Sequence, residues 1–373
     1  MTDRAGAARD ERWMRLALGL AARGLGNTWP NPAVGCVLVR DGLVVGRGWT
    51  QVGGRPHAEA MALAQAGQAA KGATAYVTLE PCSHHGRTPP CADALIQAGI
   101  SRCVVALEDP DPRVSGEGFT RLREAGIVVD IGLLGDEAAD LNAGFLLHRT
   151  QGRPLVSLKL AVSLDGRIAT HNGDSKWITN PLSRQRAHLL RARHDAILVG
   201  SNTALLDDPE LTCRLPGLPL RPAPRVVLDG RLRLSLTSKL VSTAKSQPTW
   251  LICREDADAA RQQAFADCGV EVIGVAPDAG SGLPDIRLAL EALAERGITR
   301  LLVEGGGQLA ASLIRADLVD RLLFFRAPAV IGGDGLPAIA AFGIDTVAAA
   351  PRWRRLQADI LADDLLETFA RPL

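Results

Sequence analysis

The side chains with the clearest chemical potential are a His-x-Glu sequence, His57-Ala58-Glu59, a cysteine after a proline, Cys82, and a second cysteine, Cys91. One imidazole and two thiolates fill three positions of a tetrahedral zinc site and leave the fourth open for water, as in catalytic zinc sites. Zinc lowers the pKa of water from about 15.7 towards 7 and so supplies hydroxide. Glu59, two residues from a ligand, can carry the water proton to a leaving group. The pattern predicts zinc on His57, Cys82 and Cys91, with Glu59 catalytic.

The spacing of the two cysteines leaves other interpretations open. Zinc nucleobase deaminases share the His-x-Glu and Pro-Cys signature but normally place two residues between the cysteines, whereas eight residues separate Cys82 from Cys91. A closed structural zinc would recruit His84 or His85 as its fourth ligand, and core cysteines can fall at such positions by coincidence. Glu59 favours catalysis, because holding zinc does not require it.

Composition bounds the class of protein. The 373 residues exceed the roughly 100–200 of one ordinary domain, and 47% apolar with 22% charged residues allows two cores. A net charge of +1, with basic residues spread thinly, argues against a nucleic-acid partner. No apolar run approaches the roughly 20 residues of a membrane span, and the first residues do not resemble a signal peptide. Seven scattered cysteines suit a reducing compartment, so we expect a cytoplasmic protein with no membrane partner.

The elements that must position the zinc ligands follow from hydrophobic spacing. Helical spacing predicts a helix over 10–23, and the dipeptide Asp41-Gly42 predicts a tight hairpin between strands 33–39 and 43–48. Helices and strands then alternate, which indicates an α/β layer architecture; they cover helix 57–66, strand 73–79, helix 91–98, strand 103–107 and helix 118–125. This arrangement puts ligands near helix N-termini, where the dipole and free amides stabilise thiolate.

A polar stretch over 147–154 predicts an exposed connection between two domains, 1–150 and 151–373. The second half again alternates strands with helices such as 183–193 and 286–296, and 216–224 is a Pro-rich loop. Its strands are expected at 156–161, 196–200, 225–229, 249–253, 270–275, 300–303 and 321–326. We therefore expect a second α/β domain.

The chemical signal in the second half is a glycine triplet, Gly305-Gly306-Gly307, between strand 300–303 and helix 308–315. Glycine amides can approach a phosphate at a helix N-terminus, although such a triplet is more often only a turn. It is not the six-residue dinucleotide pattern, which disfavours a Rossmann fold.

The sequence resembles the bifunctional deaminase–reductase family of riboflavin biosynthesis. The N-terminal motifs that carry the resemblance are Asn31-Pro-Ala-Val-Gly35, His57-Ala-Glu59 and Thr78-Leu-Glu-Pro-Cys-Ser-His-His-Gly-Arg-Thr-Pro-Pro-Cys91, in which the long cysteine spacing belongs to the family pattern. It continues through Leu158-Lys-Leu-Ala-Val-Ser-Leu-Asp-Gly-Arg167, Ser175-Lys-Trp-Ile-Thr179 and Leu205-Leu-Asp-Asp-Pro-Glu-Leu-Thr212. The implied fold is α/β: an N-terminal cytidine-deaminase-like three-layer α/β/α domain with a mixed sheet, and a C-terminal dihydrofolate-reductase-like α/β domain.

The resemblance implies two consecutive reactions on a small phosphoribosylated pyrimidine. The first is hydrolytic deamination of 2,5-diamino-6-(5-phosphoribosylamino)pyrimidin-4(3H)-one to 5-amino-6-(5-phosphoribosylamino)uracil, with Asn31, His84 and Arg87 placed where they can contact substrate. The second is NADPH-dependent reduction to 5-amino-6-(5-phosphoribitylamino)uracil, in which the opened ribosylamino group is an imine and its C1 receives the hydride.

By position, the resemblance implies NADPH contacts from Ala161, Trp177, Thr203, Asp207, Gly306 and Gly307. It implies substrate contacts from Lys159, Ser175, Arg191, Leu211, Arg214 and Glu304. Arg191 and Arg214 suit phosphate because guanidinium donates in a fork. Lys159, Asp207 and Glu304 are candidates to protonate the imine, and the sequence does not rank them.

One position departs from the family pattern. After Val226-Val-Leu-Asp229 many members carry a hydroxyl residue near the 2′-phosphate of the cofactor, whereas this chain has Gly230. The loss of this hydroxyl weakens the expected preference for NADPH over NADH, and Arg231 or Arg233 can compensate by charge.

Two further functions remain as alternatives, a deaminase acting on RNA bases and a non-catalytic scaffold with structural zinc. The balanced charge speaks against the first and Glu59 against the second. The sequence does not fix the oligomeric state; we expect a homo-oligomer, because small bifunctional enzymes are often symmetric dimers.

Overall fold

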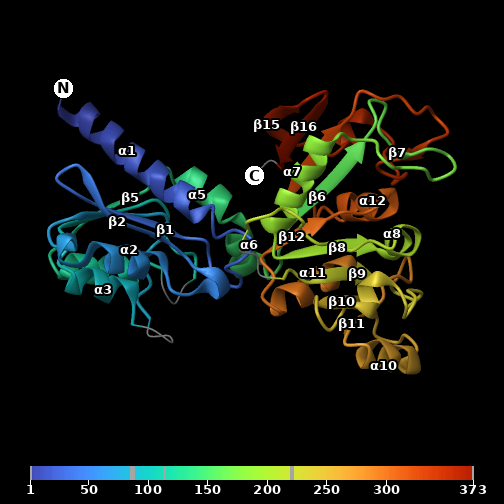
Figure 1. The fold of residues 1–373 in the computed structure, drawn as a ribbon, viewed down its shortest axis with the longest axis horizontal. Coiled ribbons are helices and arrows are strands. Elements are labelled where there is room, and N and C mark those ends of the chain that lie inside the picture. The colour runs from blue at the N-terminus through green and yellow to red at the C-terminus, as the bar shows by residue number, and fades with distance from the viewer. Residues whose placement is uncertain (1, 85–88, 112–114, 219–221, 372–373) are drawn as a thin grey trace. The chain divides into compact units, whose positions relative to one another are not determined.

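The computed structural model describes residues 2–84, 89–111, 115–218 and 222–371. The chain divides into two compact units, Met1–Gly152 and Arg153–Leu373, which appear in Figure 1 in blue to green and in green to red. Within the described ranges, no helix combines the length and the apolar character that a membrane crossing needs.

The N-terminal unit is built on a mixed five-stranded sheet with the order β2-β1-β3-β4-β5. β1 runs antiparallel to β2 and β3, whereas β3, β4 and β5 are parallel. The predicted hairpin is present, since Asp41 and Gly42 at its turn have φ values of 53° and 77°. The strands are β1 (Gly35–Arg40), β2 (Leu43–Trp49), β3 (Thr74–Val77), β4 (Arg102–Val105) and β5 (Val128–Ile131).

Helices cover both faces of this sheet, because successive side chains of a strand point to opposite sides. Cys36 and Leu38 of β1 pack in one core with residues of α2, α3, α4 and α6, and Val37 and Val39 pack in a second core with residues of α1 and α5. The three-layer α/β/α fold is thus confirmed. The helices are α1 (Thr2–Ala21), α2 (Ala58–Ala66), α3 (Cys91–Gln97), α4 (Glu117–Glu124), α5 (Gly135–Leu141) and α6 (Ala143–Gln151).

The C-terminal unit contains a nine-stranded sheet with the order β11-β10-β9-β8-β12-β6-β13-β16-β15. Neighbours from β11 to β13 pair in parallel, and β16 and β15 add an antiparallel edge. The strands are β6 (Leu155–Val162), β8 (Ala196–Gly200), β9 (Arg225–Leu228), β10 (Thr249–Arg254), β11 (Glu271–Val275), β12 (Arg300–Val303), β13 (Arg321–Arg326), β15 (Arg354–Leu361) and β16 (Asp364–Ala370), with a separate pair of β7 (Arg167–Ala169) and β14 (Leu336–Pro337).

The connections of this sheet are mostly helical, as the alternating pattern predicts. All the strands predicted in the second half are present, with bounds within about two residues of the expectation. The helices are α7 (Pro181–Ala192), α8 (Ser201–Asp207), α9 (Lys239–Ser242), α10 (Ala259–Asp267), α11 (Ile286–Glu295) and α12 (Gly307–Arg315).

The segment 147–154, expected as an exposed connection, is exposed over 149–152 and contains the division between the two units, but it is not an extended loop. Residues up to Gln151 belong to α6, and Arg153 is buried. The Arg153 guanidinium donates to both carboxylate oxygens of Asp320, at 2.7 and 2.8 Å, in the core of the second unit. The polar residues are typical of a loop, but they include a charged side chain with a buried partner 167 residues away.

Candidate active sites

The predicted zinc ligands meet at the N-termini of two helices. His57 is the N-cap residue of α2, Cys91 is the first residue of α3, and Cys82 lies on the segment that follows β3. The Cys91 amide donates to the Cys82 sulfur at 3.4 Å, and the Ala92 amide donates to the Cys82 carbonyl at 3.2 Å. The Cys82 sulfur therefore lies where a free amide at a helix N-terminus favours thiolate, as the sequence predicts.

The spacing of the three ligand atoms fits zinc. His57 Nδ1 lies 3.3 Å from the Cys91 sulfur and 3.7 Å from the Cys82 sulfur, and all three atoms lie within 4.8 Å of one another. A tetrahedral zinc with Zn–N of about 2.0 Å and Zn–S of about 2.3 Å separates nitrogen from sulfur by roughly 3.5 Å. The three groups need little movement to bind the ion.

The electrostatics around these atoms are those of a ready ligand set. Hydrogen bonds from the Cys91 thiol and from His57 lower the pKa of Cys82 to about 4, and the Cys82 sulfur raises the pKa of His57. The hydrogen bond to Cys82, together with burial, raises the pKa of Cys91, so Cys82 is the more acidic of the two thiols. Glu59, in the first turn of α2, is 3% exposed, and burial raises its pKa to about 7. A buried carboxyl beside three ligand groups is placed for proton transfer.

Glu80 fixes the segment that carries Cys82, a role that the sequence reasoning missed although the residue lies in the Thr78–Cys91 string. Its buried carboxylate accepts hydrogen bonds from three backbone amides, those of Asp109 at 3.2 Å, Gly116 at 3.1 Å and Gly118 at 2.9 Å. Gly118 must be glycine, because a Cβ there would lie 2.2 Å from the Pro81 carbonyl oxygen. The start of α4 is thereby joined to the Cys82 segment.

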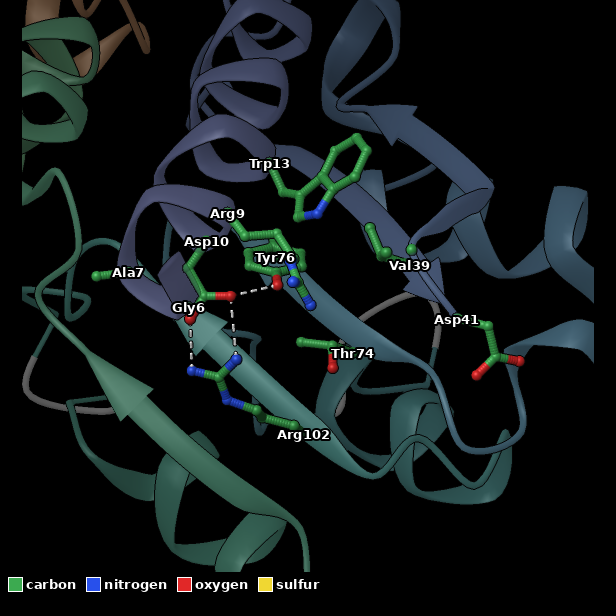
Figure 2. A pocket seen from close by; sticks show the side chains of 11 residues that line it. Gly6, Ala7, Arg9, Asp10, Trp13, Val39, Asp41, Thr74, Tyr76 and Arg102 are labelled. Carbon is green, nitrogen blue, oxygen red and sulfur yellow. Dashed lines mark hydrogen bonds and ion pairs between the residues drawn. The ribbon is translucent and has the colours of Figure 1, made fainter. Parts of the chain in front are cut away.

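A cavity of about 500 Å³ in the same unit lies apart from the zinc ligands, and Figure 2 shows it beside α1. Asp10 accepts from the Tyr76 hydroxyl at 2.6 Å and from Arg102 at 2.8 and 3.1 Å. Tyr76 and Val39 belong to the core on the α1 side of the sheet, whereas Ala58 and Ala92, next to the zinc ligands, belong to the other. Asp10, Tyr76 and Arg102 satisfy one another, and we assign this cavity no part in the zinc chemistry.

In the second unit, the topology itself marks a crevice. β8 and β12 are parallel neighbours, but the chain leaves β8 through α8 towards β9 and leaves β12 through α12 towards β13 on the other side. Ligands of open α/β sheets bind at the carboxyl ends of strands where the order reverses in this way. The turn Gly305-Gly306-Gly307 follows β12 at this edge of the sheet. A Cβ on Gly306 would lie 3.7 Å from the Thr203 hydroxyl on α8.

A buried charge cluster lies at the end of β12. The Arg191 guanidinium on α7 donates from Nε and Nη2 to the two oxygens of Glu304, at 2.6 and 3.0 Å, and from Nη1 to the Thr212 carbonyl at 2.9 Å. Lys159 Nζ on β6 lies 4.0 Å from the same carboxylate. Burial alone would raise the pKa of Glu304, but Arg191 and Lys159 outweigh it and lower that pKa to about 2. Burial lowers the pKa of Lys159.

Comparison with known proteins is decisive at this point. Residues 154–365 match the RibD C-terminal domain, and residues 7–107 match the cytidine and deoxycytidylate deaminase zinc-binding region. The riboflavin biosynthesis protein RibD of Aquifex aeolicus is 44% identical over 362 residues, 97% of this chain and 98% of that protein. The RibD of Escherichia coli is 44% identical over 358 residues, 92% and 95% of the two chains. The chain belongs to the RibD family.

Solved structures of RibD proteins share the whole fold. An Acinetobacter baumannii RibD has a TM-score of 0.87 at 38% identity, with 98% of this chain and 100% of that chain covered. A Thermotoga maritima deaminase/reductase has a TM-score of 0.85 at 35% identity, with 98% and 100% covered. Like other RibD proteins, this chain is a bifunctional deaminase and reductase of riboflavin biosynthesis that uses zinc and NADPH, and its two predicted folds are confirmed.

The remaining residues predicted for the RibD deaminase site lie partly within and partly outside the described residues. Asn31 packs against Gly54, where a Cβ would lie 1.9 Å from the Asn31 Nδ2 atom, three residues before His57. His84 is exposed and does not join the three ligands among the residues that the structure describes. His85 and Arg87 lie outside the described residues.

The residues predicted for the RibD reductase site only partly gather. Leu211 is buried with a φ of 52°, and Arg214 is about 59% exposed and pairs with Glu210 at 2.9 Å. Ala161 lies within β6, opposite Phe325 of β13. Three others, partly or fully exposed, have no hydrogen bond or ion pair with Glu304 in the described parts of the chain: Ser175, Trp177 and Asp207.

His188 is a residue near this cluster that the sequence reasoning missed. It accepts a hydrogen bond from the Arg214 amide at 3.4 Å, and burial together with Arg191 and Arg214 lowers its pKa. Its position three residues before Arg191, on the same face of α7, was the available signal.

Proposed function

We propose that residues 1–150 deaminate 2,5-diamino-6-(5-phosphoribosylamino)pyrimidin-4(3H)-one and that residues 151–373 reduce the resulting 5-amino-6-(5-phosphoribosylamino)uracil to 5-amino-6-(5-phosphoribitylamino)uracil. The observation that carries this proposal is the convergence of His57, Cys82 and Cys91 beside the buried Glu59 carboxyl. The Thermotoga maritima relative is a diaminohydroxyphosphoribosylaminopyrimidine deaminase and 5-amino-6-(5-phosphoribosylamino)uracil reductase, which supports both substrates.

In the deamination, the roles of the chain's own residues follow from their positions. His57 Nδ1 and the sulfurs of Cys82 and Cys91 are the atoms that would hold the metal. A bound zinc ion lowers the pKa of water and supplies the nucleophile. Glu59 takes the proton from the attacking water and delivers it to the departing ammonia, and the Glu80 carboxylate keeps Cys82 in place.

Replacement of Glu59 by glutamine tests this assignment. We expect zinc content near one ion per chain, a retained fold, and loss of ammonia release from the diaminopyrimidine by at least about 100-fold, the usual contribution of a positioned acid–base group. Glu124→Gln, at an exposed position of α4, is the matched control and should keep full activity. An active Glu59→Gln enzyme would refute the mechanism.

In the reduction, the charge states of the residues at the end of β12 indicate which side chain donates the proton. Bound NADPH supplies the hydride. Glu304 is held ionised by Arg191, so it has no proton to give at neutral pH. The Lys159 ammonium, 4.0 Å from that carboxylate, does carry protons. We assign Lys159 as the donor to the imine nitrogen and Glu304 as the group that orients Lys159.

The other contacts of the reductase site remain part of the proposal. Because the fork of Arg191 is directed at Glu304, the exposed Arg214 is the freer of the two arginines to meet the substrate phosphate. Ser175 and Leu211 complete the substrate contacts. The contacts to NADPH are proposed at Ala161, Trp177, Thr203, Asp207, Gly306 and Gly307.

Replacement of Lys159 by methionine, which keeps most of the aliphatic stem, tests the donor. We expect NADPH to bind with its wild-type Kd while NADPH oxidation in the presence of the deaminated substrate falls by about 100-fold or more. Lys245→Met, at an exposed position, is the control. A wild-type rate of NADPH oxidation in Lys159→Met would show that another group donates the proton.

We also propose a reducing, cytoplasmic location and a homo-oligomeric state. The two thiol ligands, Cys82 and Cys91, must stay unoxidised, and all seven cysteines are free. A deaminase acting on RNA bases is the less favoured alternative, because a net charge of +1 gives little attraction for a phosphate backbone.

A further inference from the structure

One carboxylate joins two segments of the C-terminal unit that are distant in the sequence. They are the loop 163–166, which follows β6, and residues 327–340, which follow β13 and are called the strap below. Asp165 Oδ1 accepts from the Ile331 amide at 3.1 Å, and Asp165 Oδ2 accepts from the Gly332 amide at 2.8 Å. The exposed Asp165 side chain therefore holds the strap to the loop after β6.

The Asp165 carboxylate is itself held in place from within its loop. The Ser163 hydroxyl donates to Asp165 Oδ1 at 2.6 Å and accepts from the Arg167 amide at 2.9 Å. Because Ser163 is fully buried, this hydroxyl fixes the direction of the Asp165 side chain. The Ser163 hydroxyl and the two strap amides lower the pKa of Asp165, so the carboxylate accepts these bonds in its charged form, which makes them stronger.

The strap also contacts the glycine turn at the start of α12. Its strand β14 pairs with β7, whose label marks the place in Figure 1. The Ala338 amide donates to the Gly166 carbonyl at 3.1 Å. The Ala340 amide donates to the Gly307 carbonyl at 3.0 Å, and a Cβ on Gly307 would lie 2.5 Å from the Pro337 carbonyl oxygen. The strap therefore bridges the loop after β6 and the turn that is proposed to contact NADPH.

A turn of three glycines needs support from outside if its amides are to be fixed before a ligand binds. Glycine has more backbone freedom than any other residue, so Gly305-Gly306-Gly307 has little rigidity of its own. The hydrogen bond from Ala340 and the contact with Pro337 restrict Gly307. When the strap leaves the turn, fewer molecules are ready to bind the cofactor, and the apparent Kd rises in proportion.

We propose that Asp165 is a positioning residue for NADPH: by accepting from the Ile331 and Gly332 amides, it keeps the strap on the glycine turn in the geometry that receives the cofactor. The inference rests on the proposed contacts of Gly306 and Gly307 with NADPH. Asp165 acts through the strap and not by contact with the reacting atoms. Its loss should therefore weaken cofactor binding without slowing the chemical step.

Replacement of Asp165 by asparagine in the full-length zinc-loaded protein tests this. The asparagine oxygen can accept from one strap amide, but its NH₂ group then faces the other amide, donor against donor. We expect the Kd for NADPH, measured by the fluorescence of the reduced nicotinamide, to rise by roughly 10-fold. This is the lower end for loss of a hydrogen bond to a charged group, because Asp165 is exposed.

The rate of the chemical step and the binding of the pyrimidine serve as internal comparisons. The kcat of reduction at saturating NADPH and the KM for the pyrimidine should stay within about twofold of the wild type. Asp363→Asn, at an exposed position between β15 and β16, is the matched control and should keep the wild-type Kd for NADPH.

Two further measurements on the same samples separate this effect from a general loss of structure. Ammonia release by the N-terminal unit should be unchanged, and hydrogen exchange of peptides from 327–340 should be faster in Asp165→Asn than in the wild type without NADPH. An unchanged Kd for NADPH in Asp165→Asn overturns the inference whatever the exchange of the strap, as does an equal rise in Asp363→Asn or a parallel fall in kcat. Failure of the wild type to bind NADPH counts instead against the function proposed for residues 151–373.

Discussion

Replacement of Glu304 by glutamine should destabilise the C-terminal unit by an amount that the structure allows us to calculate. The side chains of Glu304 and Arg191 are 12% and 15% exposed, so solvent screens their interaction weakly. The pKa of Glu304 is lowered from 4.5 to about 2. At 1.36 kcal/mol for each pKa unit, ionisation of this carboxyl contributes roughly 3 kcal/mol of stability at pH 7. The variant keeps the volume but leaves Arg191 and Lys159 without their counter-charge.

The sign of the pH dependence follows from the direction of the shift. Because the folded state holds the Glu304 proton less tightly than the unfolded state, the stabilisation is complete above about pH 4.5 and is lost as the pH falls towards 2. At pH 3 roughly 1 kcal/mol should remain. The wild type and Glu304→Gln should therefore converge in acid.

Calorimetry at pH 7 and pH 3 measures this difference. For a unit of about 220 residues, 3 kcal/mol corresponds to a fall in Tm of about 6–12 °C at pH 7. Glu271→Gln, which breaks the exposed pair with Arg296, is the control and should cost under about 1 kcal/mol. Equal effects of the two substitutions, or a Glu304→Gln difference that persists unchanged at pH 3, would refute the reasoning.

Three further predictions concern Cys82, Glu80 and His194. Cys82→Ser should reduce zinc to well below one ion per chain and abolish deamination while reduction persists; metal analysis checks this, with Cys268→Ser retaining zinc. Glu80→Ala leaves three amides without an acceptor and should destabilise the N-terminal unit by about 3 kcal/mol or more; an unchanged Tm would contradict it. Burial lowers the pKa of His194 to about 3, so the wild type should lose about 2 kcal/mol between pH 7 and pH 5 as the unfolded state gains the proton. His194→Gln should lack that loss in thermal scans at the two pH values, whereas the exposed His171→Gln should keep it.

Local sequence predicted the elements that carry the zinc ligands, because their signals repeat within a few residues. The Asp41-Gly42 turn, the start of α2 at His57 and the start of α3 at Cys91 all follow from backbone preferences and hydrophobic spacing. The antiparallel strands β15 and β16 were not predicted. The side chains of β15, at the edge of the sheet, are mostly exposed and give no alternating pattern. The end of α6 was predicted to be a connection because its last residues are polar, although they are helical up to Gln151.

The sequence by itself determined the chemistry available to this RibD protein: which side chains can bind zinc, which carboxyl stands beside them, and which family both halves belong to. Only the tertiary structure decided which distant residues meet. Lys159 and Glu304 are neighbours because β12 inserts between β8 and β6, and Glu80 reaches Gly118 because α4 returns beside the Cys82 segment. Such contacts depend on sheet order and helix packing, which no local pattern of residues encodes.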